Sequence, residues 1–201
     1  MARAWKFLFP LLMLLALAGG CSPDAPARAP TLNPTAAVYQ SWYDEAVAGF
    51  GRDAIAESAA GAGAAAEYRV LRDVPLLRSD FYSLQVFADG TGSFAHLAQT
   101  AKYFKGSRLL SDDNVNLNAE QTQVLLDALA QADFWDIPAA QGGGEGSSGG
   151  ETIYIEGFAG GKTHFTRTWS QNGDFNSVYQ SVQIYRTFAA AADALWGKEK
   201  P

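Results

Sequence analysis

The stretch YSLQVFADGTGSFAHLA, residues 82–98, decides the fold class. Apolar and polar residues alternate from Tyr82 to Val86, which is typical of a strand that buries one face. Asp89 and Gly90 then form a dipeptide that favours a two-residue hairpin turn, because both positions tolerate a positive φ. The stretch therefore predicts an antiparallel hairpin with one apolar face that needs a covering layer.

Two helices and a second hairpin are predicted after this hairpin. Asn118 is followed three residues later by Gln121, which is the pattern of a capping box at the start of a helix. The predicted elements are a helix from Asn118 to Trp135, a hairpin of strands 151–159 and 162–169, and a helix that follows Asp174 and ends at Gly197. Strands joined by tight turns and covered by helices on one face make an α+β domain. We therefore expect a small antiparallel sheet, built from two hairpins and backed by two helices, over residues 67–197.

Residues 38–66 precede this domain and are expected to form a helical extension that is rich in alanine and glycine. Val38, Trp42, Ala46 and Phe50 recur at the spacing of one helix face. Most of the remaining residues are small and offer little apolar area to a core. The segment is expected either to pack on the domain or to form a loose arm.

The beginning of the chain has the pattern of a secretion signal. Arg3 and Lys6 precede a short apolar run, and small residues follow directly before Cys21. The run is shorter than the roughly 20 residues that a membrane-spanning helix needs. Leu17-Ala18-Gly19-Gly20-Cys21 resembles a bacterial lipobox, which implies cleavage after residue 20 and lipidation of Cys21. The alternatives are an ordinary signal peptide with an incidental cysteine, or an uncleaved anchor.

The residues after the cysteine predict where the protein is held. Ser22 follows Cys21, and by resemblance to sorting in Gram-negative cells this favours the outer membrane over the inner one. Residues 21–37 contain several prolines and are expected to be an extended tether. The domain is expected in the periplasm, with exposure on the cell surface as the alternative.

Composition limits the class of protein further. The chain of 201 residues is 48% hydrophobic and has one cysteine. This apolar content suffices for a packed core, and one cysteine excludes a disulfide scaffold. Cleavage after residue 20 removes two of the 15 basic side chains and none of the 21 acidic ones. The resulting negative charge argues against a nucleic-acid partner.

One part of the chain is similar to a known group of domains. Phe87-Ala-Asp-Gly-Thr-Gly on a hairpin, followed by a leucine-rich helix that ends in Asp133-Phe134-Trp135, resembles a family of uncharacterised bacterial exported domains. A glycine-rich gap, a hairpin and a closing helix extend the resemblance over about residues 68–196. Many members carry paired cysteines before the first hairpin, whereas Pro75 to Asp80 contain none. The family has no established activity, so the resemblance implies no site residues.

Two histidines and one serine are the candidates for a polar site. If the first hairpin has a two-residue turn, Ser83 lies opposite His96, within about 5 Å. A catalytic dyad also needs an orienting carboxylate and an oxyanion hole, and the sequence indicates neither. We therefore expect a polar pair on the less buried face. His164 shares a face with Ile153 and Ile155 and is expected to be an ordinary sheet histidine.

A possible calcium loop fails the spacing test. Asp112-Asp113-Asn114-Val115-Asn116 places oxygen ligands at alternate positions. Counting from the first of these, Leu117 and Gln123 stand where an EF-hand loop requires glycine and glutamate. The segment is instead expected to be a solvated turn before Asn118, and the sequence predicts neither a metal nor a cofactor.

These observations favour a non-enzymatic binding or accessory module that acts on an envelope protein or polymer. One alternative is a hydrolase of envelope material, which uses Ser83 and His96 or a cleft lined with carboxylates. A second alternative is an inhibitor of a foreign envelope hydrolase. The carboxylates that such a cleft could gather are Asp112, Asp113, Asp133, Asp136, Glu151 and Glu156.

The lipid anchor can be tested directly. Replacing Cys21 with Ala removes the only thiol that can carry acyl chains, so we expect incorporation of labelled palmitate into the protein to be lost. Ser22→Ala keeps the thiol and is expected to keep the label. Palmitate incorporation that persists in Cys21→Ala would contradict the prediction of a lipoprotein.

Overall fold

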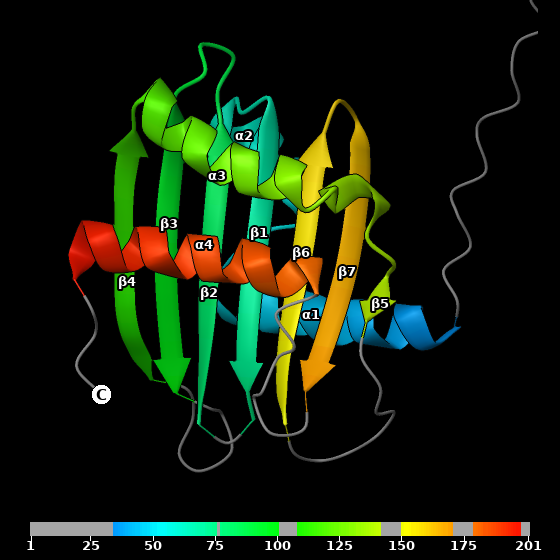
Figure 1. Ribbon diagram of the computed structural model, residues 1–201. Helices are drawn as coiled ribbons and strands as arrows, with labels where there is room; N and C mark the ends of the chain where they lie inside the picture. The colour runs from blue at the N-terminus through cyan, green and yellow to red at the C-terminus, as the bar shows by residue number, and fades with distance from the viewer. Residues whose placement is uncertain (1–33, 76, 101–107, 142–149, 171–178, 198–201) are drawn as a thin grey trace, which may run out of the picture. The chain divides into compact units, whose positions relative to one another are not determined.

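A seven-stranded sheet forms the centre of the structure (Figure 1). Its strands lie in the order β4-β3-β2-β1-β6-β7-β5. Neighbouring strands are antiparallel, except that the short β5 runs parallel to β7, so the sheet is mixed. The strands are β1 (Ala66–Val74), β2 (Arg78–Val86), β3 (Gly92–Thr100), β4 (Leu109–Leu117), β5 (Ala140–Gln141), β6 (Glu151–Ala159) and β7 (Lys162–Ser170).

This computed structural model describes residues 34–75, 77–100, 108–141, 150–170 and 179–197. The predicted signal peptide, Cys21 and most of the predicted tether lie outside the described residues. None of the helices in the described ranges combines the length and the apolar character that crossing a membrane requires.

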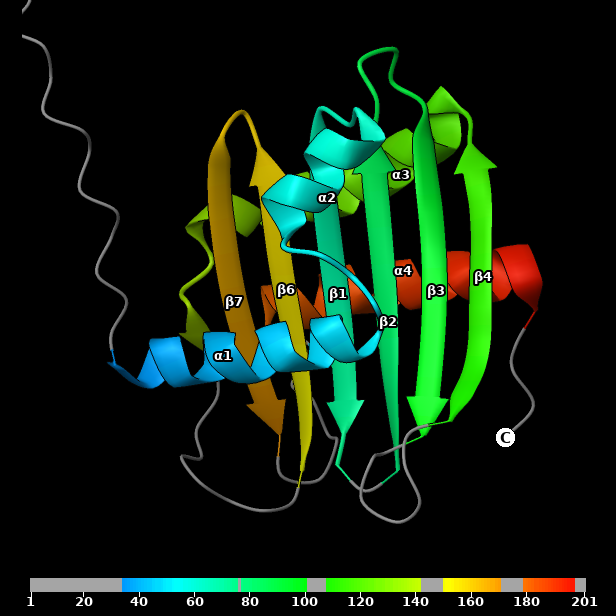
Figure 2. The same ribbon diagram turned by 180° about the vertical axis from the view of Figure 1, so that it is seen from behind.

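Helices cover both faces of the sheet. In Figure 1 α3 and α4 lie in front of the strands, and Figure 2 shows α1 and α2 on the opposite face. A sheet covered on both faces buries successive residues of its central strands, and the residues from Glu67 to Leu71 of β1 are all buried. The helices are α1 (Pro34–Gly49), α2 (Ile55–Ala62), α3 (Ala119–Gln131) and α4 (Gln180–Trp196), with a 3-10 turn η1 (Phe134–Asp136) after α3.

The larger core lies between the sheet and the pair α3 and α4. Aliphatic side chains of the central strands pack there against Leu125 and Leu129 of α3 and Phe188 of α4. The edge of the Phe188 ring meets Phe94 of β3, with ring centroids 5.8 Å apart. Burial of a side chain of this size stabilises the fold by about 1.5–3 kcal/mol.

A second core lies under α1. Tyr43, Val47 and Phe50 are buried, and the ring of Phe50 stacks on Phe81 of β2 with centroids 5.4 Å apart. The helix itself is as expected, but the predicted buried face is partly wrong, because Trp42 is 55% exposed. Val38 of the predicted face is also exposed, and Tyr39 and Tyr43 on the neighbouring face of the helix are buried instead. The predicted extension, residues 38–66, thus contains most of α1 and all of α2, which cover the second face of the sheet, and its last residue begins β1.

The expectation of a small sheet, built from two hairpins and backed by helices on one face, is wrong. The sheet has seven strands, and β1, β4 and β5 extend it beyond the two predicted hairpins. The predicted turn at Asp112–Asn116 is part of β4. β4 is an outer strand whose residues are mostly exposed or half-buried, so its sequence lacks the apolar alternation that marks a half-buried strand.

Several local predictions are confirmed. Asn118 and Gln121 form both hydrogen bonds of the capping box before α3. The second hairpin turns at Gly160 and Gly161, where Ala159 pairs with Lys162. These signals succeed because the residues that determine each structure lie within a few positions of one another.

Close packing on the α3 face depends on one glycine in β6. A Cβ added at Gly157 would lie 2.4 Å from Cε1 of Phe134 and 3.0 Å from Cδ1 of Tyr68. These two rings already meet edge to face, with centroids 5.9 Å apart. Gly157 therefore provides the space into which the Phe134 ring fits.

Replacing Gly157 with Ala is expected to lower the free energy of unfolding by about 1–3 kcal/mol, because the added methyl group overpacks the core. Urea denaturation measures this change. The matched control is Gly61→Ala in α2, where an added Cβ meets nothing within 4 Å. This control is expected to be neutral or to gain up to about 1 kcal/mol from helix propensity. Equal effects of the two substitutions would contradict the packing argument.

Candidate functional site

A pocket of about 550 Å³ lies between the C-terminal half of α4 and the strands β1 to β4. We call it the Asp80 pocket, after the carboxylate at its base. Its lining is a mixture of charged and aromatic side chains, among them Arg72, Arg78, Asp80, Tyr82, His96, Asp113, Tyr185, Asp193 and Trp196. Charged side chains on a covered sheet face are costly to bury, so their gathering here marks the pocket as a candidate site.

Asp80 of β2 is the centre of the charges in the pocket. It is 3% exposed, and its Oδ1 lies 2.6 Å from Nη2 of Arg78 and 3.3 Å from Nε2 of His96. Its Oδ2 lies 3.7 Å from Nη1 of Arg72, its neighbour across β1 and β2. Burial raises the pKa of Asp80, but hydrogen bonds from His96 and Arg78 outweigh burial and leave the pKa below its ordinary value. Asp80 is therefore ionised at neutral pH.

Arg72 links this carboxylate to two other elements. Its Nε donates a hydrogen bond to Glu151 of β6. Its guanidinium carbon also lies 5.8 Å from the centre of the Tyr185 ring on α4. A cation in this position is attracted by the ring electrons. The Tyr185 ring, on one wall of the pocket, thus already has a guanidinium group over its face, that of Arg72.

Aromatic rings form another wall of the pocket. The imidazole of His96 stacks on Tyr82, with centroids 4.6 Å apart and an angle of 8° between the planes. The indole of Trp196 stacks on two side chains of β3, with its ring centroid 5.7 Å from that of Phe94 and 6.3 Å from that of His96. These contacts hold His96 rigidly, and its side chain is only 8% exposed.

The lining of the pocket carries more negative than positive charge. Two arginines face three aspartates, and Arg72 is shared with Glu151 as well. Asp113 lies opposite His96 across β3 and β4, and Asp193 projects from α4. No ion pair joins Asp113 or Asp193 to another residue within the described ranges. As far as the described residues go, these two carboxylates can therefore accept a cation.

The predicted pairing of Ser83 with His96 is wrong by one residue. Tyr82 lies opposite His96, and Ser83 lies opposite Ala95 on the α1 face of the sheet. The turn is longer than predicted, because Phe87 N–H donates to the carbonyl of Thr91 and the Asp89 carboxylate accepts from Thr91. A slip of one residue moves a side chain to the other face. Ser83 and His96 are thus separated by the sheet.

His164 shares a face with Ile153 and Ile155, as predicted. It lies opposite Gly157 and packs against the ring of Phe134, with centroids 5.0 Å apart. Burial lowers the pKa of His164, so this imidazole is neutral at pH 7. The structure therefore places His164 in a packed layer, away from the Asp80 pocket.

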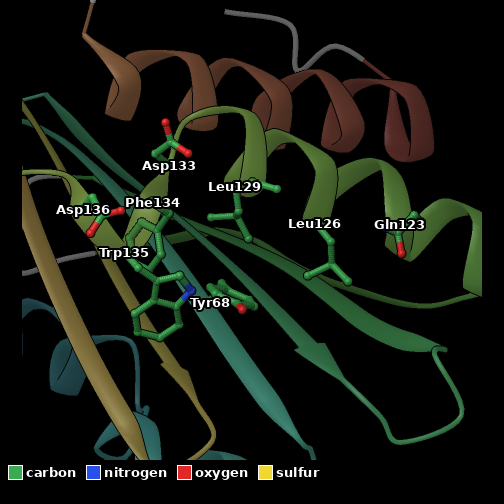
Figure 3. Close-up of a pocket in the computed structure, with 9 residues that line it drawn as sticks. Tyr68, Gln123, Leu126, Leu129, Asp133, Phe134, Trp135 and Asp136 are labelled. Carbon is green, nitrogen blue, oxygen red and sulfur yellow. The ribbon is translucent and has the colours of Figure 1, made fainter.

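A second pocket of about 410 Å³ lies at the end of α3 (Figure 3). The rings of Trp135 and Tyr68 lie together at its base, with centroids 6.3 Å apart. Trp135 is 40% exposed, and Leu126 and Leu129 of α3 complete an apolar wall. In Figure 3 the Asp133 carboxylate points away from the Tyr68 ring, and a second carboxylate, Asp136, lies beside Trp135 and Phe134.

The carboxylates expected in a hydrolytic cleft do not come together. Asp113 lines the Asp80 pocket, whereas Asp133 and Asp136 line the pocket at the end of α3. Glu151 binds Arg72, and Glu156 lies under α1. Asp112 lies on the opposite face of β4 from Asp113. Within the described ranges, no group of three or more potential metal ligands lies together. The described lining of the Asp80 pocket also contains no serine, threonine or cysteine that could act as a nucleophile.

Sequence reasoning missed Asp80, Arg72 and Arg78, which form the base of the pocket. The available signal was the run of charged residues at either end of Pro75, where β1 turns into β2. Recognising that Arg72 faces Asp80 requires the register of the β1–β2 hairpin. Asp193 and Trp196 line the pocket only because α4 packs across the sheet at this place, and no spacing in the sequence indicates that packing.

A separate buried polar cluster lies under α1 and α2. Nε of Arg69 donates to Glu67 at 2.6 Å, and its Nη1 donates to the carbonyl of Asp53 at 2.7 Å. Arg69 and Glu67 are each 1% exposed. Burial raises the pKa of the neighbouring Glu156 from 4.5 to about 7, although the positive charge of Arg69 opposes this shift. The cluster supports the packing of the two helices on the sheet.

The resemblance to exported bacterial domains over residues 68–196 stays a prediction. In comparisons with known proteins, no protein-family model and no curated protein matches the chain.

Glu156 gives the stability of the fold a definite pH dependence. The folded chain holds a proton on Glu156 that the unfolded chain releases between about pH 4.5 and 7. The free energy of unfolding therefore falls as the pH rises through this window. Glu156→Gln is expected to remove this part of the dependence and to be more stable than the parent at pH 8. Urea denaturation at pH 5 and pH 8 measures both effects.

The control for this experiment is Glu45→Gln, which removes an exposed carboxylate from α1. It is expected to leave the difference between the two pH values unchanged. If Glu156→Gln keeps the full pH dependence of the parent, Glu156 is not the buried acid that holds the proton.

Proposed function

We propose that this protein is a non-enzymatic binding module of the bacterial envelope, anchored to the outer membrane through lipids on Cys21. The module binds a cationic group of an envelope protein or polymer in the Asp80 pocket. The observation that carries the proposal is the pair Asp113 and Asp193, which lack ion-pair partners among the described residues and line a pocket with aromatic walls.

The chemistry of the pocket favours an ammonium or guanidinium group as the ligand. Ionised carboxylates form strong, charge-assisted hydrogen bonds with such donors. Aromatic ring faces attract the same groups by about 0.5–2 kcal/mol. Trp196 supplies a ring at the end of α4 beside Asp193, and the position of Arg72 over Tyr185 shows that a guanidinium group fits this environment.

The arrangement of His96 favours binding over catalysis. Its Nε2 faces the ionised Asp80, and its ring is fixed by stacking on Tyr82. A general base must lie within hydrogen-bonding distance of the nucleophile that it activates. Ser83, the predicted partner, lies on the opposite face of the sheet. The pocket thus has the groups that recognise a ligand and lacks the pair that would attack one.

The proposed anchor sets where the partner is found. About 13 residues separate Cys21 from the start of α1 at Pro34, and a chain of that length spans at most about 45 Å when fully extended. The module therefore meets proteins and polymers close to the membrane surface. The negative charge of the chain repels anionic lipid, so the proposed attachment depends on the lipid groups.

The proposal is tested by titrating the purified full-length protein with N-acetyl-lysine methylamide. Two-dimensional NMR is expected to show saturable shifts of backbone amides in β3, β4 and α4. Asp113→Asn and Asp193→Asn are each expected to weaken the affinity about three- to tenfold, because each removes one charged acceptor. N-acetyl-norleucine methylamide, which lacks the ammonium group, is expected to cause no saturable shift.

The matched control is Asp112→Asn. Asp112 carries the same charge on the same strand but lies on the other face of the sheet. It is expected to keep the parent affinity. No saturable shift with the lysine derivative, or equal binding of the norleucine derivative, would contradict a cation site in the Asp80 pocket.

A further inference from the structure

The strand beside the Asp80 pocket is the outer strand of the sheet. β4 pairs with β3 along its length, with one irregularity opposite Ala98 and Gln99, and it pairs with no other strand in the described parts of the chain. Figures 1 and 2 show no described strand beyond its outer edge, while the C-terminal end of α4 extends past that edge on one face of the sheet. An outer strand offers a row of backbone N–H and C=O groups to which an extended segment can add.

The charge of β4 selects among the segments that could add to it. Its nine residues include Asp112 and Asp113 and no basic residue. A second copy of β4 in antiparallel pairing would bring these carboxylates near their own copies, and like charges on facing strands destabilise a sheet. A segment with basic side chains would gain from the same positions. Charge complementarity therefore favours a basic partner over self-association.

The register of β4 connects this edge to the pocket. Asp113 lies opposite His96 and lines the pocket, so the α4 face of β4 forms its rim. A strand added to β4 would lie about 4.8 Å from it and would turn every second side chain toward the α4 face. A lysine or arginine side chain opposite Asp113 would share the α4 face with it and lie close enough to reach its carboxylate at the rim of the pocket.

We infer that the partner is a protein with an extended basic segment, which adds to β4 as an eighth strand and places a lysine or arginine side chain in the Asp80 pocket. This inference rests on the proposed function, since it uses the same cation site. It adds that backbone pairing along β4 supplies part of the affinity and that the partner is a polypeptide.

The test uses a labelled peptide in which lysine and threonine alternate over nine residues, acetylated and amidated at its ends. Its binding to the purified full-length protein is measured by fluorescence anisotropy. The peptide is expected to bind more tightly than N-acetyl-lysine methylamide, and Asp113→Asn is expected to weaken its binding. A peptide with glutamate in place of lysine is expected not to bind.

Two N-methylated peptides separate strand addition from binding by charge alone. One carries N-methyl groups on the threonines and the other on the lysines. In an antiparallel pair only every second residue directs its N–H to the neighbouring strand. We therefore expect one methylated peptide to lose about tenfold or more in affinity, while the other binds like the parent peptide.

Strand addition would be overturned if both methylated peptides bind like the parent peptide, or if both lose affinity to the same extent. Failure of the parent peptide to bind more tightly than the lysine derivative would also overturn it. Both results leave the proposed cation site standing if the lysine derivative still binds. Failure of the lysine derivative and of all peptides would overturn the proposed function and this inference together.

Discussion

Charged side chains on the central strands must be paired, because helices cover the sheet on both faces. On the α4 face Arg72 pairs with Asp80 across β1 and β2 and also binds Glu151 of β6. On the α1 face Arg69 pairs with Glu67 along β1. An uncompensated charge in such a place would cost several kcal/mol. The contacts of Arg72 connect β1 to both of its neighbouring strands, whereas the Arg69–Glu67 pair lies within β1.

The same pairing explains why the charge left without an ion-pair partner at the Asp80 pocket is negative. Asp80 and Glu151 together engage Arg72, so this cation is not available to a ligand. The carboxylates at the rim, Asp113 and Asp193, have no such partner among the described residues. Rings that are held by the core stand beside them. A preorganised site of this kind suits recognition, because little conformational entropy is lost when a ligand binds.

The sequence predicts the structures that neighbouring residues determine, and it fails where distant residues decide. The capping box before α3 is visible because Asn118 and Gln121 are three positions apart. β4 escapes prediction because an outer strand needs no apolar alternation, and its polar residues resemble a turn. His96 is a candidate from the sequence, yet its partner Asp80 emerges only from the correct register of β2 and β3. That register depends on the turn at Asp89, whose side chain accepts hydrogen bonds from Thr91. If the predicted turn is one residue too short, the residue placed opposite His96 is one that lies on the other face of the sheet.

The position of α1 in the chain has a consequence for the order of folding. α1 is the first described element, but its buried Tyr43 packs on Tyr154 of β6 and Phe165 of β7, with ring centroids 5.8 and 5.4 Å away. These strands follow α1 in the chain, and a helix of 16 residues without its packing partners is only weakly stable in water. Docking of α1 is therefore a late event. Until it occurs, Tyr154 and Phe165 lack the Tyr43 ring that packs on them in the folded protein.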